Sequence, residues 1–151
     1  MSNPRQFCTF YVGDMFLGIP VEHVQEVLRY HAMTRVPRAA SSVSGLINLR
    51  GQIVTAIDLR RRLGLPPRDA ARLPMNVVLR TSDGAVSLLV DAIGDVTEVG
   101  EDAFEPSPPT LSDALRKLVR GAYKLDRHLL LVLDDAEVLD VADNSAALLT
   151  S

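Results

Sequence analysis

Apolar and polar residues alternate along much of the chain, which is the pattern of β-strands that bury one face. The stretch FCTFYVGDMFLGIP at 7–20 contains two such runs, separated by a Gly-Asp pair at 13–14. The stretch NVVLRTSDGAVSLLV at 76–90 contains two more, separated by an Asp-Gly pair at 83–84. Glycine and aspartate tolerate the positive φ angles of tight turns, so each stretch predicts a β-hairpin.

The remaining elements are short, and the chain is predicted to be mainly β. Further strands are predicted at GQIVTAID (51–58) and HLLLVLDD (128–135). Brief helical patterns occur at LRRRLGL (59–65), DALRKL (113–118) and DAEVLDV (135–141), and VEHVQEV (21–27) is expected to hold one helical turn before a strand. Ser112 directly precedes the pattern at 113–118 and is a residue type favoured as a helix N-cap. Proline-rich connections occupy 64–74 and 104–110.

An internal repeat relates the two halves of the chain. The pattern Val-x-x-Val-x-Glu-Val at 21–27 recurs as Val-x-x-Ile-x-Asp-Val at 90–96. The order of glycine, leucine, an apolar pair and a final aspartate at 45–58 recurs at 121–134. Both pairings follow the same chain order, which indicates duplication of one small unit.

The two copies of this unit are predicted at about 7–64 and 75–139. Each holds about five short strands, and closing them into a barrel would remove their exposed edges. A barrel of this size buries only a thin core, so the two copies are expected to pack along a shared apolar seam. Whether the copies exchange strands stays open at this point.

Composition narrows the function. The chain has 151 residues, of which 47% are hydrophobic, so it can bury the core of one ordinary domain. Its net charge of −3 disfavours nucleic-acid binding. The single cysteine cannot form an internal disulfide, which fits a reducing, cytosolic setting. The longest apolar runs are far too short to span a bilayer, so no membrane insertion is expected.

Motifs for catalysis are missing, so the chain is expected to be no enzyme and to bind no cofactor or metal. His23, His31 and His128 lack the spacing of metal ligands, and no phosphate-binding glycine loop or nucleophile motif occurs. Cys8 lies in an apolar strand pattern, as a buried thiol would. The basic run Arg60–Arg62 leaves a small-barrel nucleic-acid-binding protein as the alternative function, although a short basic helical face is normally solvated.

An arginine interrupts the apolar stretch GLINLRGQIVTAIDLRRRLG at 45–64. Taken as one strand, the start of the stretch has Leu46, Asn48 and Arg50 on one face, which thus presents an amide and a guanidinium group. The opposite, core-like face has Ile47, Leu49 and Gly51. The matching positions of the second copy lack both asparagine and arginine, which indicates a specific task for Arg50.

The same stretch resembles the signature of CheW-like domains, in which Gly-x-x-Asn-Leu-Arg-Gly precedes an apolar run and Asp-Leu-Arg. The resemblance covers nearly the whole chain, because the opening hairpin and LLVDAIGDVTEV at 88–99 also resemble the family. Thr55 departs from the pattern, since the family often has proline there. The resemblance implies a single CheW-like domain over 1–151, with two SH3-like five-stranded β-barrels around a shared hydrophobic seam and a few short helices.

The resemblance also implies a function. Members of this family are adaptors that couple chemoreceptors to the histidine kinase CheA. CheA and CheV carry the same domain, but this chain has no room for a kinase or receiver domain, so a standalone adaptor is expected. Its expected partners are the cytoplasmic tip of a methyl-accepting chemoreceptor and the regulatory domain of a CheA-type kinase. The expected location is the cytoplasm, with recruitment to membrane-associated receptor arrays.

By position, the resemblance implies a receptor-binding groove between the barrels. Its expected residues are Val24, Glu26, Gly45, Asn48 and Arg50 from the first copy and Ile93 and Val96 from the second. The apolar residues would give contact area, Gly45 would admit a partner backbone, and Arg50 would pair with Glu26 on a neighbouring strand. Simpler roles stay open, with the valines as core, Gly45 as relief at a bulge and Arg50 as a solvated charge.

Overall fold

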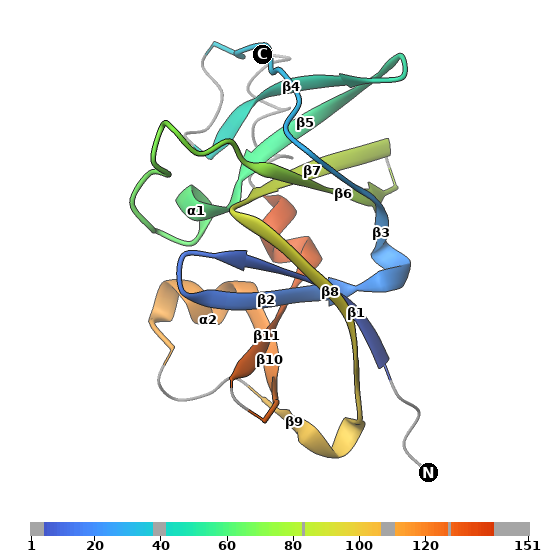
Figure 1. The fold of residues 1–151 in the computed structure, drawn as a ribbon, viewed down its shortest axis with the longest axis vertical. Helices are drawn as coiled ribbons and strands as arrows, with labels where there is room; N and C mark the ends of the chain where they lie inside the picture. Colours follow the sequence, from blue (N-terminus) through green and yellow to red (C-terminus); the bar gives the residue numbers. More distant parts are fainter. Residues whose placement is uncertain (1–4, 38–41, 83, 107–110, 127, 141–151) are drawn as a thin grey trace.

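The computed structural model describes residues 5–37, 42–82, 84–106, 111–126 and 128–140. In these residues the chain forms two curved β-sheets, one above the other in Figure 1. Sheet A has six strands in the order β8-β1-β2-β11-β10-β9, and sheet B has five in the order β3-β6-β7-β5-β4.

The strands are short, and most neighbours are antiparallel. Sheet A consists of β1 (Arg5–Val12), β2 (Met15–Pro20), β8 (Ala92–Val99), β9 (Phe104–Glu105), β10 (Val119–Lys124) and β11 (Leu129–Leu133). Sheet B consists of β3 (Val24–Leu28), β4 (Val43–Leu49), β5 (Gln52–Asp58), β6 (Met75–Thr81) and β7 (Gly84–Val90). Only β11 with β2 and β5 with β7 run parallel among the described strands. Each sheet curves into an SH3-like barrel, so the predicted fold class is confirmed.

Each sheet combines strands from both halves of the sequence. In sheet A, β1 and β2 of the first half pair with β8 and β11 of the second. In sheet B, β3 pairs with β6 and β5 pairs with β7. The chain passes from sheet A to sheet B at the 3-10 turn η1 (Val21–His23) and returns at Asp91, between β7 and β8. The halves are therefore interwoven, which the repeat alone did not determine.

The described residues form three buried apolar clusters. One draws on sheet B alone, with Ile47, Leu49, Val54, Ala56, Val78 and Leu89. One draws on sheet A alone, with Phe7, Val99, Tyr123, Leu130 and Val132. The largest draws on both sheets, and includes Phe10, Leu17 and Leu131 from sheet A and Val24, Val77 and Leu88 from sheet B. This largest cluster is the shared hydrophobic seam, and its burial stabilises the contact between the barrels.

The two predicted hairpins are present, with one change of register. β1 and β2 are joined by Gly13 and Asp14, and Gly13 has a φ of 59°. In the second hairpin Thr81 pairs with Gly84, so Gly84 begins β7 instead of occupying the turn. Asp83 lies outside the described residues.

Short helical segments connect the strands. They are η1, α1 (Leu59–Arg62), η2 (Glu101–Ala103), α2 (Asp113–Leu118) and the helical residues 135–140. The predicted cap is confirmed, because the Ser112 hydroxyl accepts a 3.2 Å hydrogen bond from the Leu115 N–H. Val141 and residues 107–110 of the predicted proline-rich connection lie outside the described residues. Among the described helices, none is long and apolar enough to cross a membrane.

Candidate functional site

β4 and β5 form a hairpin whose loop contains only Arg50 and Gly51, because Leu49 pairs with Gln52. Arg50 has a φ of 51° and Gly51 a φ of 87°, as a type I′ turn requires at its two central positions. The Asn48 side-chain oxygen accepts a 2.9 Å hydrogen bond from the Gly51 N–H, which supports the turn. The expectation of one strand through Arg50 is therefore wrong, and Gly51 is exposed instead of lying on the core face.

The turn places the Arg50 guanidinium against Glu26 on β3. Arg50 Nη2 donates a hydrogen bond to Glu26 Oε2, so the expected ion pair is present. The two residues are not cross-strand neighbours as expected, because β3 and β4 are the opposite edges of sheet B. The ion pair instead joins the β4–β5 turn to β3, the strand at the other edge of the sheet. The Arg50 side chain is 70% exposed, so most of it remains accessible to a partner.

The ion pair keeps both groups charged. The hydrogen bond from Arg50, followed by a weaker one from Gln25, lowers the pKa of Glu26 below its ordinary value. The hydrogen bond to Glu26 raises the pKa of Arg50. The carboxylate and the guanidinium therefore both stay ionised across the physiological pH range.

Gly45 lies in β4, directly against an earlier segment of the same chain. Thr34 forms an antiparallel bridge with Leu46, through hydrogen bonds of 2.9 and 2.8 Å. A Cβ atom at position 45 would lie 2.6 Å from the Thr34 carbonyl oxygen and 3.2 Å from the Met33 Cβ. The protein's own backbone fills this space, which corrects the expectation that it admits a partner backbone. The pairing of β4 with β5 also shifts register between Val43 and Gly45, so the simpler role beside a bulge fits.

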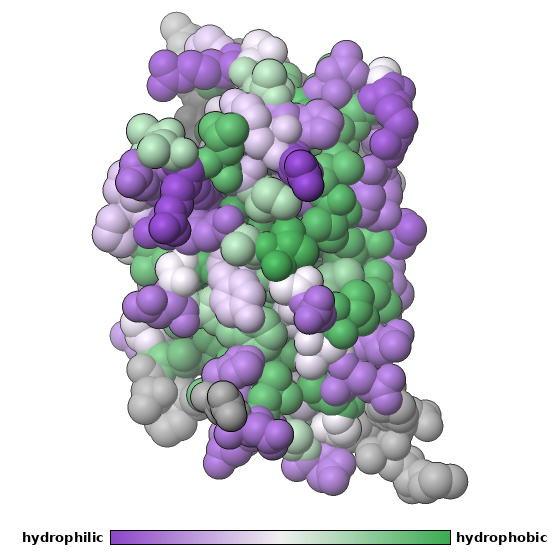
Figure 2. Space-filling model, viewed as in Figure 1, coloured by the Kyte–Doolittle hydropathy of each residue, from purple (hydrophilic) through white to green (hydrophobic). Residues whose placement is uncertain are grey.

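The three apolar residues expected in the groove differ in exposure. Val24 is 8% exposed and belongs to the shared seam, so its simpler role as a core residue fits. Ile93 on β8 is half-buried and packs against the same seam, whereas Val96 on β8 is 57% exposed. Figure 2 shows apolar surface along the region where β3 and β8 lie in Figure 1. Of the three, Val96 offers the most surface to a partner.

Apart from Val24 and Gly45, the expected site residues fall into two groups. Glu26, Asn48 and Arg50 lie together at the β4–β5 turn of sheet B. Ile93 and Val96 lie on β8, an edge strand of sheet A. A partner that contacted both groups would have to bridge the two barrels.

Ile53 is a surface residue that the sequence analysis missed. It is 60% exposed and pairs with Asn48 across the hairpin, so it adds apolar surface beside the polar turn. Val54, the next residue, is fully buried. Because both residues are apolar, the alternation could not indicate which of them faces outward.

Only Arg61 of the basic run Arg60–Arg62 is exposed, which corrects the expectation that the whole run is a solvated face. The Arg60 side chain is only 17% exposed and pairs with Asp91. Arg62 donates hydrogen bonds to the carbonyl oxygens of Glu137 and Val138. These contacts occupy two of the cations on which the nucleic-acid alternative rested. Within the described residues, no three His, Cys, Asp or Glu side chains gather so as to hold a metal ion.

The fold and the site define a class of small β-proteins that consist of two packed SH3-like barrels. Exposed candidate binding residues lie on both barrels. The family model described as the CheW-like domain matches residues 6–143. The chain therefore belongs to the CheW-like domain family.

Several chemotaxis proteins are similar to this chain. The probable chemotaxis protein CheW of Rhizobium etli is 29% identical over 143 residues, which cover 95% of this chain and 92% of that protein. The chemotaxis protein CheW of Bacillus subtilis is 30% identical over 143 residues, with the same shares covered. The crystal structure of the scaffolding protein TtCheW from Thermoanaerobacter tengcongensis has a TM-score of 0.78 and 26% identity, covering 87% of this chain and 90% of that one. The similarity thus extends over nearly the whole of each protein.

Proposed function

We propose that the protein is a non-catalytic adaptor that couples methyl-accepting chemoreceptors to a CheA-type histidine kinase. It binds the cytoplasmic tip of the receptor between the two barrels and the regulatory domain of the kinase through another barrel surface. It acts in the cytoplasm, recruited to membrane-associated receptor arrays. Membership in the CheW-like family, with relatives named as chemotaxis and scaffolding proteins, supports this proposal.

The exposed guanidinium of Arg50 is the observation that carries the proposal. The tight turn and the ion pair with Glu26 hold it in place, so little side-chain freedom is lost when a partner binds. Its planar fork suits a carboxylate or a pair of carbonyl oxygens. Ile53 on the same hairpin and Val96 on the other barrel add exposed apolar surface. A fixed arginine beside apolar surface is the composition of an interface hot spot.

Removing the guanidinium should weaken receptor binding without unfolding the protein. We expect Arg50→Ala to bind a soluble fragment of the receptor tip roughly five- to thirty-fold more weakly, because a contact of hot-spot type is lost. The melting temperature should barely change, since the ion pair is exposed and alanine tolerates the left-handed turn about as well as arginine does. Arg50→Lys should restore binding only in part, because it keeps the charge and loses the fork. Titration calorimetry and thermal melting measure both quantities on the same samples.

Lys124→Ala provides a matched control. It removes an exposed ion pair with Glu105, on β10 at the far side of sheet A from β8. Binding by this variant should equal that of the wild type. Normal binding by Arg50→Ala, together with a much lower melting temperature, would make Arg50 a structural residue and contradict its proposed role.

The nucleic-acid alternative predicts a different result in the same assay format. A protein of that kind would bind an unrelated DNA or RNA oligonucleotide with an affinity that falls steeply as salt increases. The adaptor should bind the receptor fragment and leave the oligonucleotide unbound. The opposite pattern would replace the proposed function by the alternative.

A further inference from the structure

The single-turn helix α1 connects the two barrels. Leu59 is fully buried and Leu63, directly after the helix, is 7% exposed, and both belong to the seam between the barrels. The helix follows β5 of sheet B, but two of its arginines bond to groups that directly precede or follow strands of sheet A. α1 therefore has both an apolar and a polar connection to the other barrel.

Arg60 makes the first polar connection, through Asp91. Arg60 Nη1 donates to Asp91 Oδ2, and Arg68 Nε donates to Asp91 Oδ1 at 2.8 Å. The Gly13 N–H, in the β1–β2 turn of sheet A, donates to Asp91 Oδ2 at 2.7 Å. Asp91 itself connects β7 of sheet B to β8 of sheet A, and its N–H donates to the Tyr11 carbonyl oxygen at 2.9 Å. One carboxylate thus joins α1, the β1–β2 turn and the start of β8.

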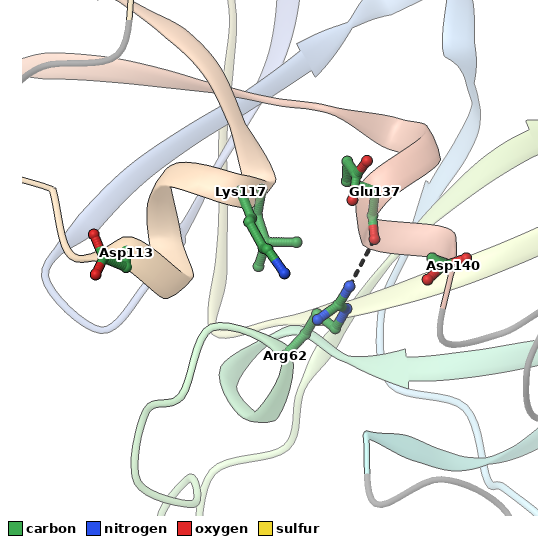
Figure 3. A pocket seen from close by; sticks show the side chains of 6 residues that line it. Arg62, Asp113, Lys117, Glu137 and Asp140 are labelled. Carbon is green, nitrogen blue, oxygen red and sulfur yellow. Dashed lines mark hydrogen bonds between the residues drawn. The ribbon is translucent and has the colours of Figure 1, made fainter.

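Arg62 makes the second polar connection. Its Nη2 donates to the Glu137 carbonyl oxygen at 2.7 Å and its Nε to the Val138 carbonyl oxygen at 3.4 Å. These carbonyls belong to the helical residues 135–140, which follow β11 of sheet A. Figure 3 shows the Arg62 guanidinium reaching from α1 toward the helical turn that carries Glu137.

A cavity lies beside this second connection. It has a volume of about 390 Å³ and is lined by Arg62, Asp113, Lys117, Leu118, Glu137 and Asp140. α1, α2 and the helical residues 135–140 therefore meet around open space and polar side chains on this side. Apolar packing does not fill the gap there, so the hydrogen bonds of Arg62 form a direct link across it.

The seam and the arginines contribute differently to the contact between the barrels. Burial of the seam supplies most of the attraction, but the hydrophobic effect has no preferred direction. Charge-assisted hydrogen bonds fix distance and angle more narrowly. The expected receptor groove has Arg50 on one barrel and Val96 on the other, so its shape depends on the angle between the barrels.

We propose that Arg60 and Arg62 are positioning residues that fix the angle between the barrels and so hold the two walls of the receptor groove in register. This role rests on the proposed receptor binding. Neither arginine is expected to touch the receptor, and both act through the direction of their bonds to Asp91 and to the carbonyls of residues 137–138.

The test measures the angle and the affinity on the same variants. Residual dipolar couplings of the backbone amides, fitted separately to the strands of sheet A and sheet B, report the relative orientation of the barrels. Titration with the soluble receptor-tip fragment reports the affinity. The variants are Arg60→Met and Arg62→Met, singly and together, and the conservative pair Arg60→Lys and Arg62→Lys. Arg61→Met is the matched control, because Arg61 lines a different hollow, with Met33 and Leu89 of the sheet B side.

We expect the control to keep the wild-type orientation and affinity. In the double methionine variant, the relative orientation of the alignment tensors of the two sheets should differ from that in the wild type. The affinity for the receptor fragment should fall roughly two- to thirty-fold. The lysine pair should change both quantities less, because an ammonium group still bonds to Asp91 and to a carbonyl. Should the double variant fail to fold, the single variants and the lysine pair carry the comparison.

Two results would overturn the inference. One is a loss of affinity with the wild-type orientation retained, and the other is a changed orientation with unchanged affinity. If the wild-type chain itself does not bind the receptor fragment, the proposed function fails. The couplings then still decide whether the arginines fix the angle.

Discussion

Gly45→Asp is expected to destabilise the fold by about 3–5 kcal/mol, the cost typical of a site that is overfilled and also buries an unpaired charge. Gly45 is buried, and a Cβ atom there would lie 2.6 Å from the Thr34 carbonyl oxygen. The added carboxylate would face that carbonyl and repel it. Either the bridge between Thr34 and Leu46 opens or β4 moves away from its place in sheet B. Urea unfolding followed by circular dichroism measures the loss.

Two other glycine variants separate the causes. Gly45→Ala adds the Cβ atom without the charge, so it should cost less, about 1–3 kcal/mol. Gly64→Asn is the control, because its φ of 77° suits asparagine and nothing lies within 4 Å of the added Cβ atom. It should stay within about 1 kcal/mol of the wild type. Wild-type stability of Gly45→Asp would mean that the segment at 33–34 does not pack on β4 as described.

The loss of stability expected for Gly45→Asp also limits the use of this variant as a test of binding. If Gly45 admitted a partner backbone, as the resemblance implied, aspartate at this position would block the partner and spare the fold. The close contact with Thr34 predicts that the fold itself is damaged, so weaker receptor binding by Gly45→Asp would say nothing about the groove. Arg50→Ala is the sharper test, because its side chain is mostly exposed.

The sequence predicted the type of fold better than the arrangement of its strands. Alternation and turn residues are local signals, so they located the hairpin at 13–14 and the cap at Ser112. The repeat indicated two barrels, but a repeat shows which segments are alike and not which segments pair. The parallel pairing of β5 with β7 joins residues about 30 positions apart, and no local pattern encodes that choice.

The β4–β5 turn shows how a site residue can be found while its backbone is misassigned. Next to the turn, the buried positions are Ile47 and Leu49 on β4 and Val54 and Ala56 on β5, so the alternation changes phase. Ile53 next to Val54 hides the change, since both are apolar. An Arg-Gly loop also lacks the Asn-Gly or Asp-Gly pair that usually marks a type I′ turn.

The roles of Arg60 and Arg62 had no signal in the sequence at all. Arg60 pairs with a carboxylate 31 positions further along the chain, and Arg62 bonds to backbone carbonyls about 75 positions away. Every residue has a carbonyl, so such an acceptor leaves no trace in residue types. Three consecutive arginines on one helical turn also point in different directions, about 100° apart, and so need not share one environment.

Asp91→Asn is expected to be strongly destabilising, at about 3–5 kcal/mol near neutral pH, because it removes the carboxylate that bonds to both Arg60 and Arg68 in a largely buried group of charges and leaves Asp58 to pair with Arg68 alone. The Asp91 side chain is 19% exposed, and the Arg68 and Arg60 side chains beside it are 9% and 17% exposed. Asparagine keeps the shape of the side chain and loses the negative charge that lies between the Arg60 and Arg68 guanidinium groups. Asp95→Asn, an exposed carboxylate on β8, serves as the control and should have little effect.

The pH dependence of the stability lost in Asp91→Asn shows whether the charge or the shape of the Asp91 side chain stabilises the fold. Burial by itself raises the pKa of Asp91, but the hydrogen bond from the Gly13 N–H and the interactions with Arg68 and Arg60 outweigh it, so the pKa lies below its ordinary value. A carboxyl group whose pKa is lower in the folded than in the unfolded state stabilises the fold above the unfolded value, about 3.9. That contribution is lost as the pH falls through the lower, folded value.

The unfolding free energies of the wild type and Asp91→Asn should therefore differ most near neutral pH and converge in acid. A difference that stayed constant down to the acid limit would mean that the substitution acts through packing, and that the charges around Asp91 do not stabilise the contact between the barrels.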